Sequence, residues 1–236
     1  MASPIWQQIQ RTLHSEIADG RFTPGDKLPT EAALAQRFGV NRHTVRRALA
    51  ELSDEGLVHA RRGSGVFVRA APVSYRVGRR SRFSQNLKAA GLSGAREILR
   101  LDTAQASRAD AEALTLKKGD PIHILESVGL IDDAPALFGL SLFPAAGLDE
   151  FPDALRQTGS ITAALQACGI GNYRRAWTRL TAERATGNTA RHLRISEGAP
   201  IIRAKSLNLT DDARPIEYAH TSFCADRVEL LIEEGA

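Results

Sequence analysis

The sequence predicts a two-domain α+β protein, with three helices and a β-hairpin in residues 1–70 and a mainly antiparallel sheet in residues 81–236. Apolar side chains recur at helical spacing three times before Gly56. Two short β-prone runs then flank a glycine turn, and beyond Arg96 strand-like segments alternate with short helices. A chain of 236 residues suits two modest domains, and Pro72 with its small neighbours indicates a linker at residues 71–80.

Two short helices in the first domain are separated by a very tight turn. Thr30 can cap the first of them, and Gly39 is a natural left-handed stop. The next helix begins after Asn41, whose side-chain oxygen can accept hydrogen bonds from free amides of the first turn, and it ends at Gly56. Because only Gly39 and Val40 separate the two helices, the pair predicts a helix-turn-helix.

A helix before this pair and a hairpin after it complete a winged helix-turn-helix. The front helix begins at Ser3, as the cap, and Pro4, at the first helical position, and its apolar residues repeat every four positions until Gly20. The hairpin consists of residues 57–62 and 66–68 around Gly63-Ser64-Gly65. Arginines at its tip suit a wing that lies on the phosphate backbone or in the minor groove.

The helix after Asn41 has one apolar face and one basic face. Residues at i, i+3, i+4 and i+7 form the core-facing stripe, namely Val45, Ala48, Leu49 and Leu52. The basic side chains lie away from this stripe, near the start of the helix, which is what a helix entering the major groove needs. By itself such a helix could equally be a solvated basic surface, but its helical and hairpin neighbours favour DNA binding.

Positive charge is concentrated in the first part of the chain. The net charge is +3 for residues 1–70, +6 for residues 71–96 and −5 for residues 97–236. An electrostatic footprint on phosphates requires this distribution, and the acidic C-terminal part gives no reason to expect contact with nucleic acid.

Residues 4–69 resemble, in register, the N-terminal domain of gntR-family bacterial transcription regulators, through the motifs Pro24–Glu31, Gly39–Leu49 and Arg61–Val68. In that family the second helix, the reading helix and the wing contact DNA. Two departures, Ala32 where many members have Arg and His43 where many have Thr, leave the base preference open. The resemblance implies DNA contacts for Arg42, His43, Thr44, Arg46, Arg62 and Gly63, and we expect Thr30 and Arg47 to contact DNA as well.

The second domain is predicted to contain strands at 96–105, 122–131, 136–143, 173–183, 201–209, 215–223 and 228–232, and helices at 108–116, 148–157, 160–168 and 189–193. Three of its motifs, Leu114–Ile122, Ser160–Leu165 and Arg214–Tyr218, resemble the effector-binding UTRA domain of HutC-type regulators, which has a chorismate-lyase-like fold. Further matches at Arg80–Leu87 and Tyr173–Ala182 are similar to the PhnF-like branch, whose members control phosphonate or phosphate uptake and degradation.

Effector domains of this kind bind phosphorylated or carboxylated metabolites, so basic residues are candidates for binding the anionic group. The strand segment Glu126–Leu130 has none, which argues against a sugar phosphate held there. Simple alternation places Arg175, Trp177 and Arg179 on one strand face and Arg174 with Ala176 on the other, although these arginines could equally be a solvated face. Residues 75–87 could likewise be a basic linker near DNA or part of an anion site. The predicted effector-binding residues are Ser81, Arg82, Ser84, Arg179, Glu217 and Tyr218.

Several classes of protein are not indicated. Cys168 and Cys224 lie far apart without metal-ligand spacing, and the six histidines show no metal-site pattern. A nucleophile elbow, a P-loop and a dinucleotide fingerprint are all missing. No apolar run approaches the 18 residues of a membrane span and no signal-peptide layout is present. We therefore expect a cytoplasmic protein that is not an enzyme and has no metal, no cofactor and no membrane partner.

The expected function is ligand-responsive transcription regulation, with a small anionic effector such as a phosphonate or a phosphate-containing metabolite. A homodimer is expected on a palindromic double-stranded DNA operator, because one reading helix covers only a half-site. Repression is the expected sign, and phosphonate or phosphate uptake or catabolism genes are the expected targets. The alternatives are control of amino-sugar, histidine or other carbon catabolism, a lyase-type enzyme with a DNA-targeting head, and an architectural DNA-binding protein without an effector.

Overall fold

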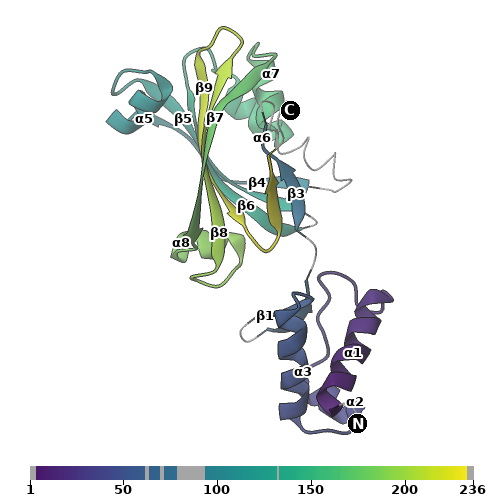
Figure 1. Ribbon diagram of the computed structural model, residues 1–236. Helices are drawn as coiled ribbons and strands as arrows, with labels where there is room; N and C mark the ends of the chain where they lie inside the picture. The colour runs from purple at the N-terminus through teal and green to yellow at the C-terminus, as the bar shows by residue number, and fades with distance from the viewer. Residues whose placement is uncertain (1–3, 62–63, 70–71, 79–93, 132, 233–236) are drawn as a thin grey trace. The chain divides into compact units, whose positions relative to one another are not determined.

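The computed structural model describes residues 4–61, 64–69, 72–78, 94–131 and 133–232 (Figure 1). The chain divides into two compact units, Met1–Ala71 and Pro72–Ala236. Each unit has its own hydrophobic core, and each is described here by itself.

The N-terminal unit is the predicted winged helix-turn-helix. Thr30 accepts a hydrogen bond from the amide of Ala33, and Gly39 ends the second helix with a φ of 64°. Asn41 caps the third helix, as predicted, whereas Pro4 is itself the N-cap of the first helix. The elements are α1 (Ile5–Ala18), α2 (Glu31–Phe38), α3 (Arg42–Asp54), and the antiparallel wing strands β1 (Val58–Arg61) and β2 (Gly65–Val68).

The core of this unit is made by the predicted apolar stripe of α3 and the facing residues of the other elements. Leu13 of α1, Leu34 of α2 and Val58 of β1 are fully buried against it. The stripe consists of Val45, Ala48, Leu49 and Leu52, and all four are buried. Burying this stripe leaves the opposite, basic face of α3 to solvent.

The C-terminal unit is built on one six-stranded antiparallel sheet. Its strand order is β4-β5-β6-β9-β8-β7, so β4 and β7 are the edges. All the predicted strands are present, and the hairpin between β5 and β6 is confirmed. The strands are β4 (Gly94–Gln105), β5 (Pro121–Ile131), β6 (Ala134–Pro144), β7 (Tyr173–Arg184), β8 (Pro200–Thr210) and β9 (Pro215–Cys224).

A second, two-stranded sheet pairs strands from opposite ends of this unit. Strand β3 (Val73–Arg76) runs parallel to β10 (Val228–Leu231). Residues 73–76 were expected in the linker, but Tyr75 is buried against Phe223 of β9, with ring centroids 5.1 Å apart. Burial of this aromatic side chain is the physical reason that the segment is a strand.

Four short helices among the described residues cover the two faces of the large sheet. Helices α6 (Phe151–Thr158) and α7 (Ile161–Ala167) lie on the same side as β3, whereas α5 (Arg108–Leu114) and α8 (Gly187–Leu193) lie on the other side (Figure 1). Helix α6 begins at Phe151 and not at residue 148, because Pro152 suits only the first turn. We call the side of α6, α7 and β3 the inner face and the side of α5 and α8 the outer face.

Candidate functional site

The start of α3 presents polar and basic side chains on a firmly capped helix end. The Asn41 side-chain oxygen accepts hydrogen bonds from the amide and the hydroxyl of Thr44, both at 2.9 Å. Arg42 and His43 are exposed on the same first turn. Because the cap fixes this turn, these side chains start from a defined backbone position.

Arg46 is held by an acidic residue that sequence reasoning did not single out. Its Nε and a terminal nitrogen donate to the two carboxylate oxygens of Glu31, at 3.1 and 2.8 Å. These hydrogen bonds lower the pKa of the Glu31 carboxyl, so the pair is charged at neutral pH. The Arg46 side chain is still 62% exposed, and the fork-to-fork pairing orients it without burying it.

The other predicted DNA contacts have different surroundings. The Arg47 guanidinium lies 4.4 Å from the ring centroid of Trp6 on α1, so this residue also ties α3 to α1. Thr30 is exposed and caps α2. Arg62 and Gly63 lie outside the described residues.

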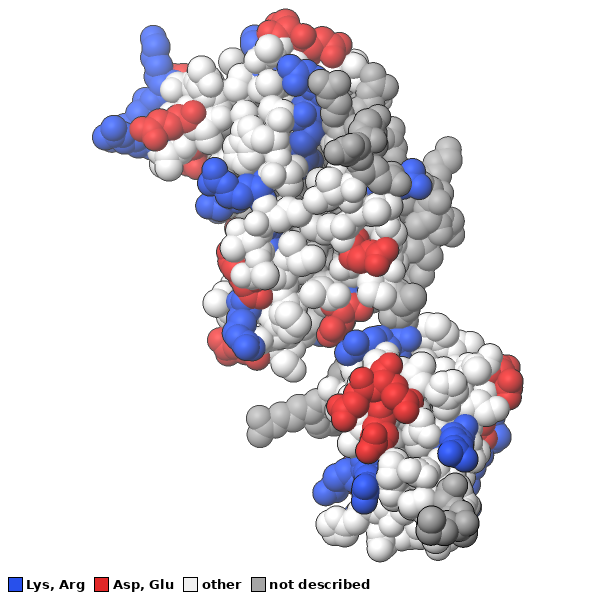
Figure 2. Space-filling model, viewed as in Figure 1, with Lys and Arg blue, Asp and Glu red and all other residues white. Residues whose placement is uncertain are grey.

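Lys27 is a further basic residue at the wing. A Cβ atom on Gly65, whose φ is +117°, would lie 2.7 Å from the Lys27 Cε, so the lysine stem crosses the wing strand at that point. Figure 2 shows one face of the N-terminal unit, on which acidic side chains lie among basic ones. DNA binding would therefore depend on where particular basic residues lie and not on a uniformly positive surface.

The inner face of the C-terminal sheet contains a cavity of about 470 Å³. It exists because three neighbouring strands present short side chains at the centre of that face, while larger side chains and the chain between α6 and α7 surround them. The short residues are Gly139, Ser141, Ala204, Ser206, Ala219 and Thr221, and the surrounding ones include Tyr75, Arg96, Leu137, Tyr173, Arg175 and Phe223.

A chain of hydrogen bonds crosses one part of this cavity. Arg175 donates through Nε to Asn208 Oδ1 at 2.7 Å and through a terminal nitrogen to Thr178 Oγ1 at 3.1 Å. Asn208 Nδ2 donates to Glu217 Oε2 at 2.7 Å, and Ser141 Oγ donates to Glu217 Oε1 at 2.8 Å. The amide group of Asn208 thus connects a guanidinium to a buried carboxylate.

Arg96 supplies a second guanidinium to the cavity. A terminal nitrogen donates to Ser127 Oγ at 2.7 Å. Burial lowers the pKa of Arg96, and the negative charge of Glu217 opposes this effect. An arginine stays protonated in a protein, so the cavity has a partly buried positive charge on the β4 side.

The structure brings only part of the predicted effector set to this cavity. Glu217 lines it, whereas Arg179 and Tyr218 project from the outer face of the sheet, where both lie near Trp177. Ser81, Arg82 and Ser84 lie outside the described residues.

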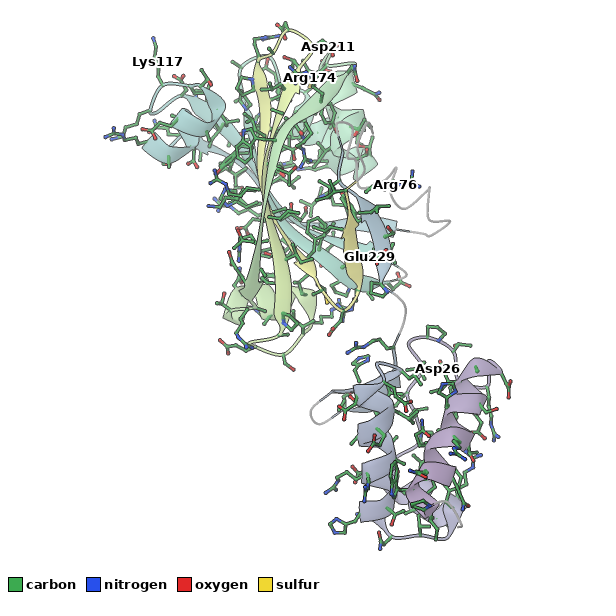
Figure 3. All side chains as sticks on the ribbon, in the orientation of Figure 1. Asp26, Arg76, Lys117, Arg174, Asp211 and Glu229 are labelled. Atoms are coloured by element: carbon green, nitrogen blue, oxygen red, sulfur yellow. The ribbon has the colours of Figure 1, made fainter. Side chains whose placement is uncertain are left out.

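The predicted alternation along β7 was wrong. The register of β7 against β8 shifts between Arg175 and Trp177, so Arg175 pairs with Asn208 while Trp177 pairs with Leu207. This bulge at Ala176 turns Arg175 and Thr178 to the cavity and places Trp177 and Arg179 on the outer face. Arg174, at the start of β7 near the turn that contains Asp211, is labelled in Figure 3.

Sequence reasoning missed most of the polar residues of the cavity. The sequence predicts Arg96 only as the start of a strand, and its patterns single out neither Ser141 nor Asn208. Short polar residues occur in the strands of most proteins without binding a ligand. The alternation of side chains along a strand therefore could not identify these residues as part of a site. Their common feature is visible only after strand pairing: all three lie on the inner face.

The described residues support neither a metal site nor a membrane-spanning helix. Within them, no three His, Cys, Asp or Glu side chains are grouped so that they could hold a metal ion. No helix in the described part of the chain has both the length and the apolar character that a membrane span requires.

Comparison with known proteins identifies both units. Residues 6–68 match the family "Bacterial regulatory proteins, gntR family", and residues 89–229 match the "UTRA domain" family. An uncharacterized HTH-type transcriptional regulator of Rhizobium meliloti is 38% identical over 99% of this chain and 96% of its own length. The "Probable transcriptional regulator PhnF" of Escherichia coli is 33% identical over 97% of this chain and 94% of its own length.

Two more distant matches also cover nearly the full length of the chain. The "HTH-type transcriptional repressor NagR" of Bacillus subtilis is 27% identical over 97% of this chain and 93% of its own length. The crystal structure of PhnF from Mycobacterium smegmatis superposes with a TM-score of 0.64, covering 99% of this chain and 100% of that one at 24% identity. At that identity the structural match supports the fold alone.

Proposed function

This chain belongs to the gntR family of bacterial regulatory proteins, in the HutC-type group that carries a UTRA domain, and we propose that it is a repressor released from DNA by a phosphonate or phosphate-containing metabolite. Its two domains are those of ligand-responsive, DNA-binding transcription regulators and not of enzymes. The sign of regulation, the class of effector and the dimeric state are parts of the proposal.

The observation that carries the proposal is the charged cavity in the UTRA domain. Two guanidinium groups, of Arg96 and Arg175, line one cavity of about 470 Å³, a size that suits a small metabolite. Each is oriented by a neutral acceptor, Ser127 or Asn208. Oriented arginine forks are the groups that bind phosphate or phosphonate oxygens most effectively.

The PhnF relative supports phosphonate or phosphate metabolism as the controlled pathway. The repressor NagR carries a different name and matches a similar share of this chain, so control of amino-sugar or other carbon catabolism stays the alternative. The two hypotheses require different effectors, because a sugar phosphate needs hydroxyl-binding groups in its site in addition to an anion-binding group. The effector therefore discriminates between the pathways more directly than any feature of the DNA-binding unit.

Binding of the effector would change operator affinity only through a different affinity for two states of the protein. The DNA contacts that we propose are those at the starts of α2 and α3 and at the wing: Thr30, Arg42, His43, Thr44, Arg46, Arg47, Arg62 and Gly63. Lys27 joins them because its stem lies across Gly65 of the wing.

The test is thermal unfolding of the full-length protein with phosphate, methylphosphonate, 2-aminoethylphosphonate, N-acetylglucosamine 6-phosphate, urocanate and sulfate. We expect selective, saturable stabilisation by a phosphonate, since a ligand that binds only the folded state raises its stability by mass action. The same compound should release operator DNA. Stabilisation by the sugar phosphate or urocanate alone would refute the phosphonate assignment and keep the regulator.

A pair of arginine variants locates the effector. Arg175→Gln removes a cavity guanidinium and should reduce the ligand-induced rise in unfolding temperature. Arg179→Gln is the matched control, because Arg179 is on the same strand but faces outward. An equal effect of the two substitutions would place the effector somewhere other than this cavity.

A further inference from the structure

Glu217 is a buried carboxylate in the cavity, with an exposed fraction of only 7%. Among the described residues, its hydrogen-bond donors are two neutral groups, the Ser141 hydroxyl on Oε1 and the Asn208 amide on Oε2. Each carboxylate oxygen can accept two hydrogen bonds, so each keeps capacity for one more. A buried negative charge is costly unless a positive charge compensates it.

Arg96 compensates part of this charge from a distance. It influences Glu217 electrostatically, and one of its terminal nitrogens donates a hydrogen bond to Ser127 on β5. Ser141 on β6 pairs with Leu125, so Ser127 and Ser141 are diagonal neighbours across two adjacent strands. Such neighbours lie about 7–8 Å apart. The cavity thus presents a guanidinium and a carboxylate that are anchored on two separate serines.

Of the described arginines of the cavity, Arg175 lies on the far side of the carboxylate. Arg175 reaches Glu217 only through the amide of Asn208, which accepts from the arginine and donates to the carboxylate. The neutral amide keeps the two charged groups from pairing directly. The structure therefore maintains a negative group between two positive ones inside one cavity.

From this arrangement we infer that the effector is zwitterionic: its anionic group binds the cavity arginines, and an ammonium group on a short chain binds Glu217. This inference rests on the proposed function, since it specifies the ligand of the same cavity. An ammonium group carries three donors and a full positive charge, so it can fill the free acceptor positions on Glu217 and neutralise the buried carboxylate. A ligand with the anion alone would leave that charge only partly compensated, by Arg96.

The competing explanation is that Glu217 serves only to orient Asn208 and, through it, Arg175. In that case the carboxylate would matter equally for every anionic ligand. The two explanations differ in one measurable quantity, the preference of the protein for a ligand with an amino group over a matched ligand without one.

The experiment is isothermal titration calorimetry of the full-length protein with 2-aminoethylphosphonate and ethylphosphonate, which have the same carbon chain. The wild-type protein should bind the aminophosphonate roughly tenfold or more tightly, as expected for a charge-assisted hydrogen bond. Glu217→Gln should bring the ratio of the two affinities close to one. The glutamine can still accept from Asn208 and can donate to the Ser141 hydroxyl, so the variant suits the same hydrogen-bond network.

Two control variants complete the design. Arg179→Gln, on the outer face, should keep the wild-type ratio. Arg175→Gln should weaken both ligands by the same factor, because it removes part of the anion site that the ligands share. The wild-type ratio needs no variant, so the inference can be tested even if Glu217→Gln does not fold.

Three results would overturn the inference. Equal affinity of wild-type protein for the two phosphonates would mean that no group recognises the amine. A Glu217→Gln variant that weakens both ligands equally would show a purely orienting role. Binding of neither phosphonate would overturn the proposed effector class itself, and this result is distinguishable from equal binding of the two.

Discussion

At the scale of single residues, Arg46 is the candidate DNA contact with the best-defined geometry. Its guanidinium is exposed and oriented by Glu31. If it forms a two-bond contact with a base, Arg46→Ala should weaken operator binding by about 1–3 kcal/mol and relax base choice at one position. The measurement is a gel-shift or anisotropy titration against the operator and its single-base variants.

The control for this prediction is another paired arginine in the same unit. Arg37 on α2 forms an ion pair with Glu16 of α1, so Arg37→Ala should change stability and leave base choice as it was. A loss of affinity on Arg46→Ala that is equal for all DNA sequences would identify a phosphate contact and contradict base reading.

His123 provides a pH-dependent prediction for the C-terminal unit. Its Nε2 lies 3.1 Å from the Leu148 carbonyl oxygen, which can only accept, so Nε2 carries the proton and Nδ1 accepts from the Thr103 hydroxyl. Burial lowers the pKa of His123 below its ordinary 6.5. The ring is therefore neutral in the folded protein at pH values where the unfolded chain is already protonated.

Proton linkage determines whether the free energy of unfolding rises or falls with pH. Below pH 6.5 the unfolded chain binds a proton at His123 that the folded state does not, so the free energy of unfolding should fall as the pH is lowered, until the folded pKa is passed. The slope per histidine is at most about 1.4 kcal/mol per pH unit. Burial also lowers the pKa of His220, which adds an effect of the same sign.

Urea unfolding between pH 7.5 and 5 measures this effect. His123→Gln should make the free energy of unfolding less dependent on pH, whereas His14→Gln, at an exposed position on α1, is the matched control. An identical pH dependence in wild-type protein and His123→Gln would contradict the assignment.

At the scale of elements, strand β6 supplies part of the floor of the cavity that we propose for the effector. Gly139 forms part of the cavity floor, and a Cβ atom there would meet its nearest neighbours at 3.7 Å, an ordinary contact. Gly139→Val should therefore fold and fill part of the cavity, because a β-branched residue suits a strand. We expect ligand affinity to fall by roughly tenfold or more, since the added methyl groups take up ligand space.

Calorimetric titration and thermal unfolding check this prediction together. Gly171→Val is the matched control, because a Cβ atom at Gly171 meets nothing within 4 Å and the residue is not part of the cavity. Unchanged ligand affinity in Gly139→Val, with normal unfolding, would show that the effector binds elsewhere.

Strand β7 shows what the sequence pattern of a strand can predict and what it cannot. The sequence predicts a strand at residues 173–183, and the structure confirms it with an end one residue later, at Arg184. The bulge at Ala176 was not predicted, because a bulge depends on how the partner strand is aligned. That single extra residue decides that Arg175, and not Arg179, faces the cavity.

At the scale of the whole molecule, the two units divide DNA recognition and ligand binding. One α3 helix covers a half-site, so we expect a homodimer of the 25.6 kDa chain. The operator selected from random DNA should be an inverted repeat with half-site centres about one helical turn, ~34–36 Å, apart. Sedimentation equilibrium should give twice the chain mass, and a monomer that binds one half-site with full affinity would contradict this expectation.

The sequence by itself determined the fold class, the caps of α2 and α3, and the buried stripe of α3. These features depend on interactions between residues close along the chain, such as the Asn41 cap on Thr44 and the spacing of Val45 and Leu52. The family resemblance extended the same local motifs to DNA binding and effector binding.

Only the tertiary structure decided the composition of the cavity. Arg96 on β4 and Ser141 on β6 are far in the sequence from Asn208 and Glu217 on the neighbouring strands β8 and β9, and all four residues meet through the order β4-β5-β6-β9-β8-β7. Tyr218, next to Glu217 in the chain, faces the opposite side because successive residues of a strand alternate. A buried site of this kind depends on pairing between strands, and the order of the residues in the sequence does not reveal which strands pair.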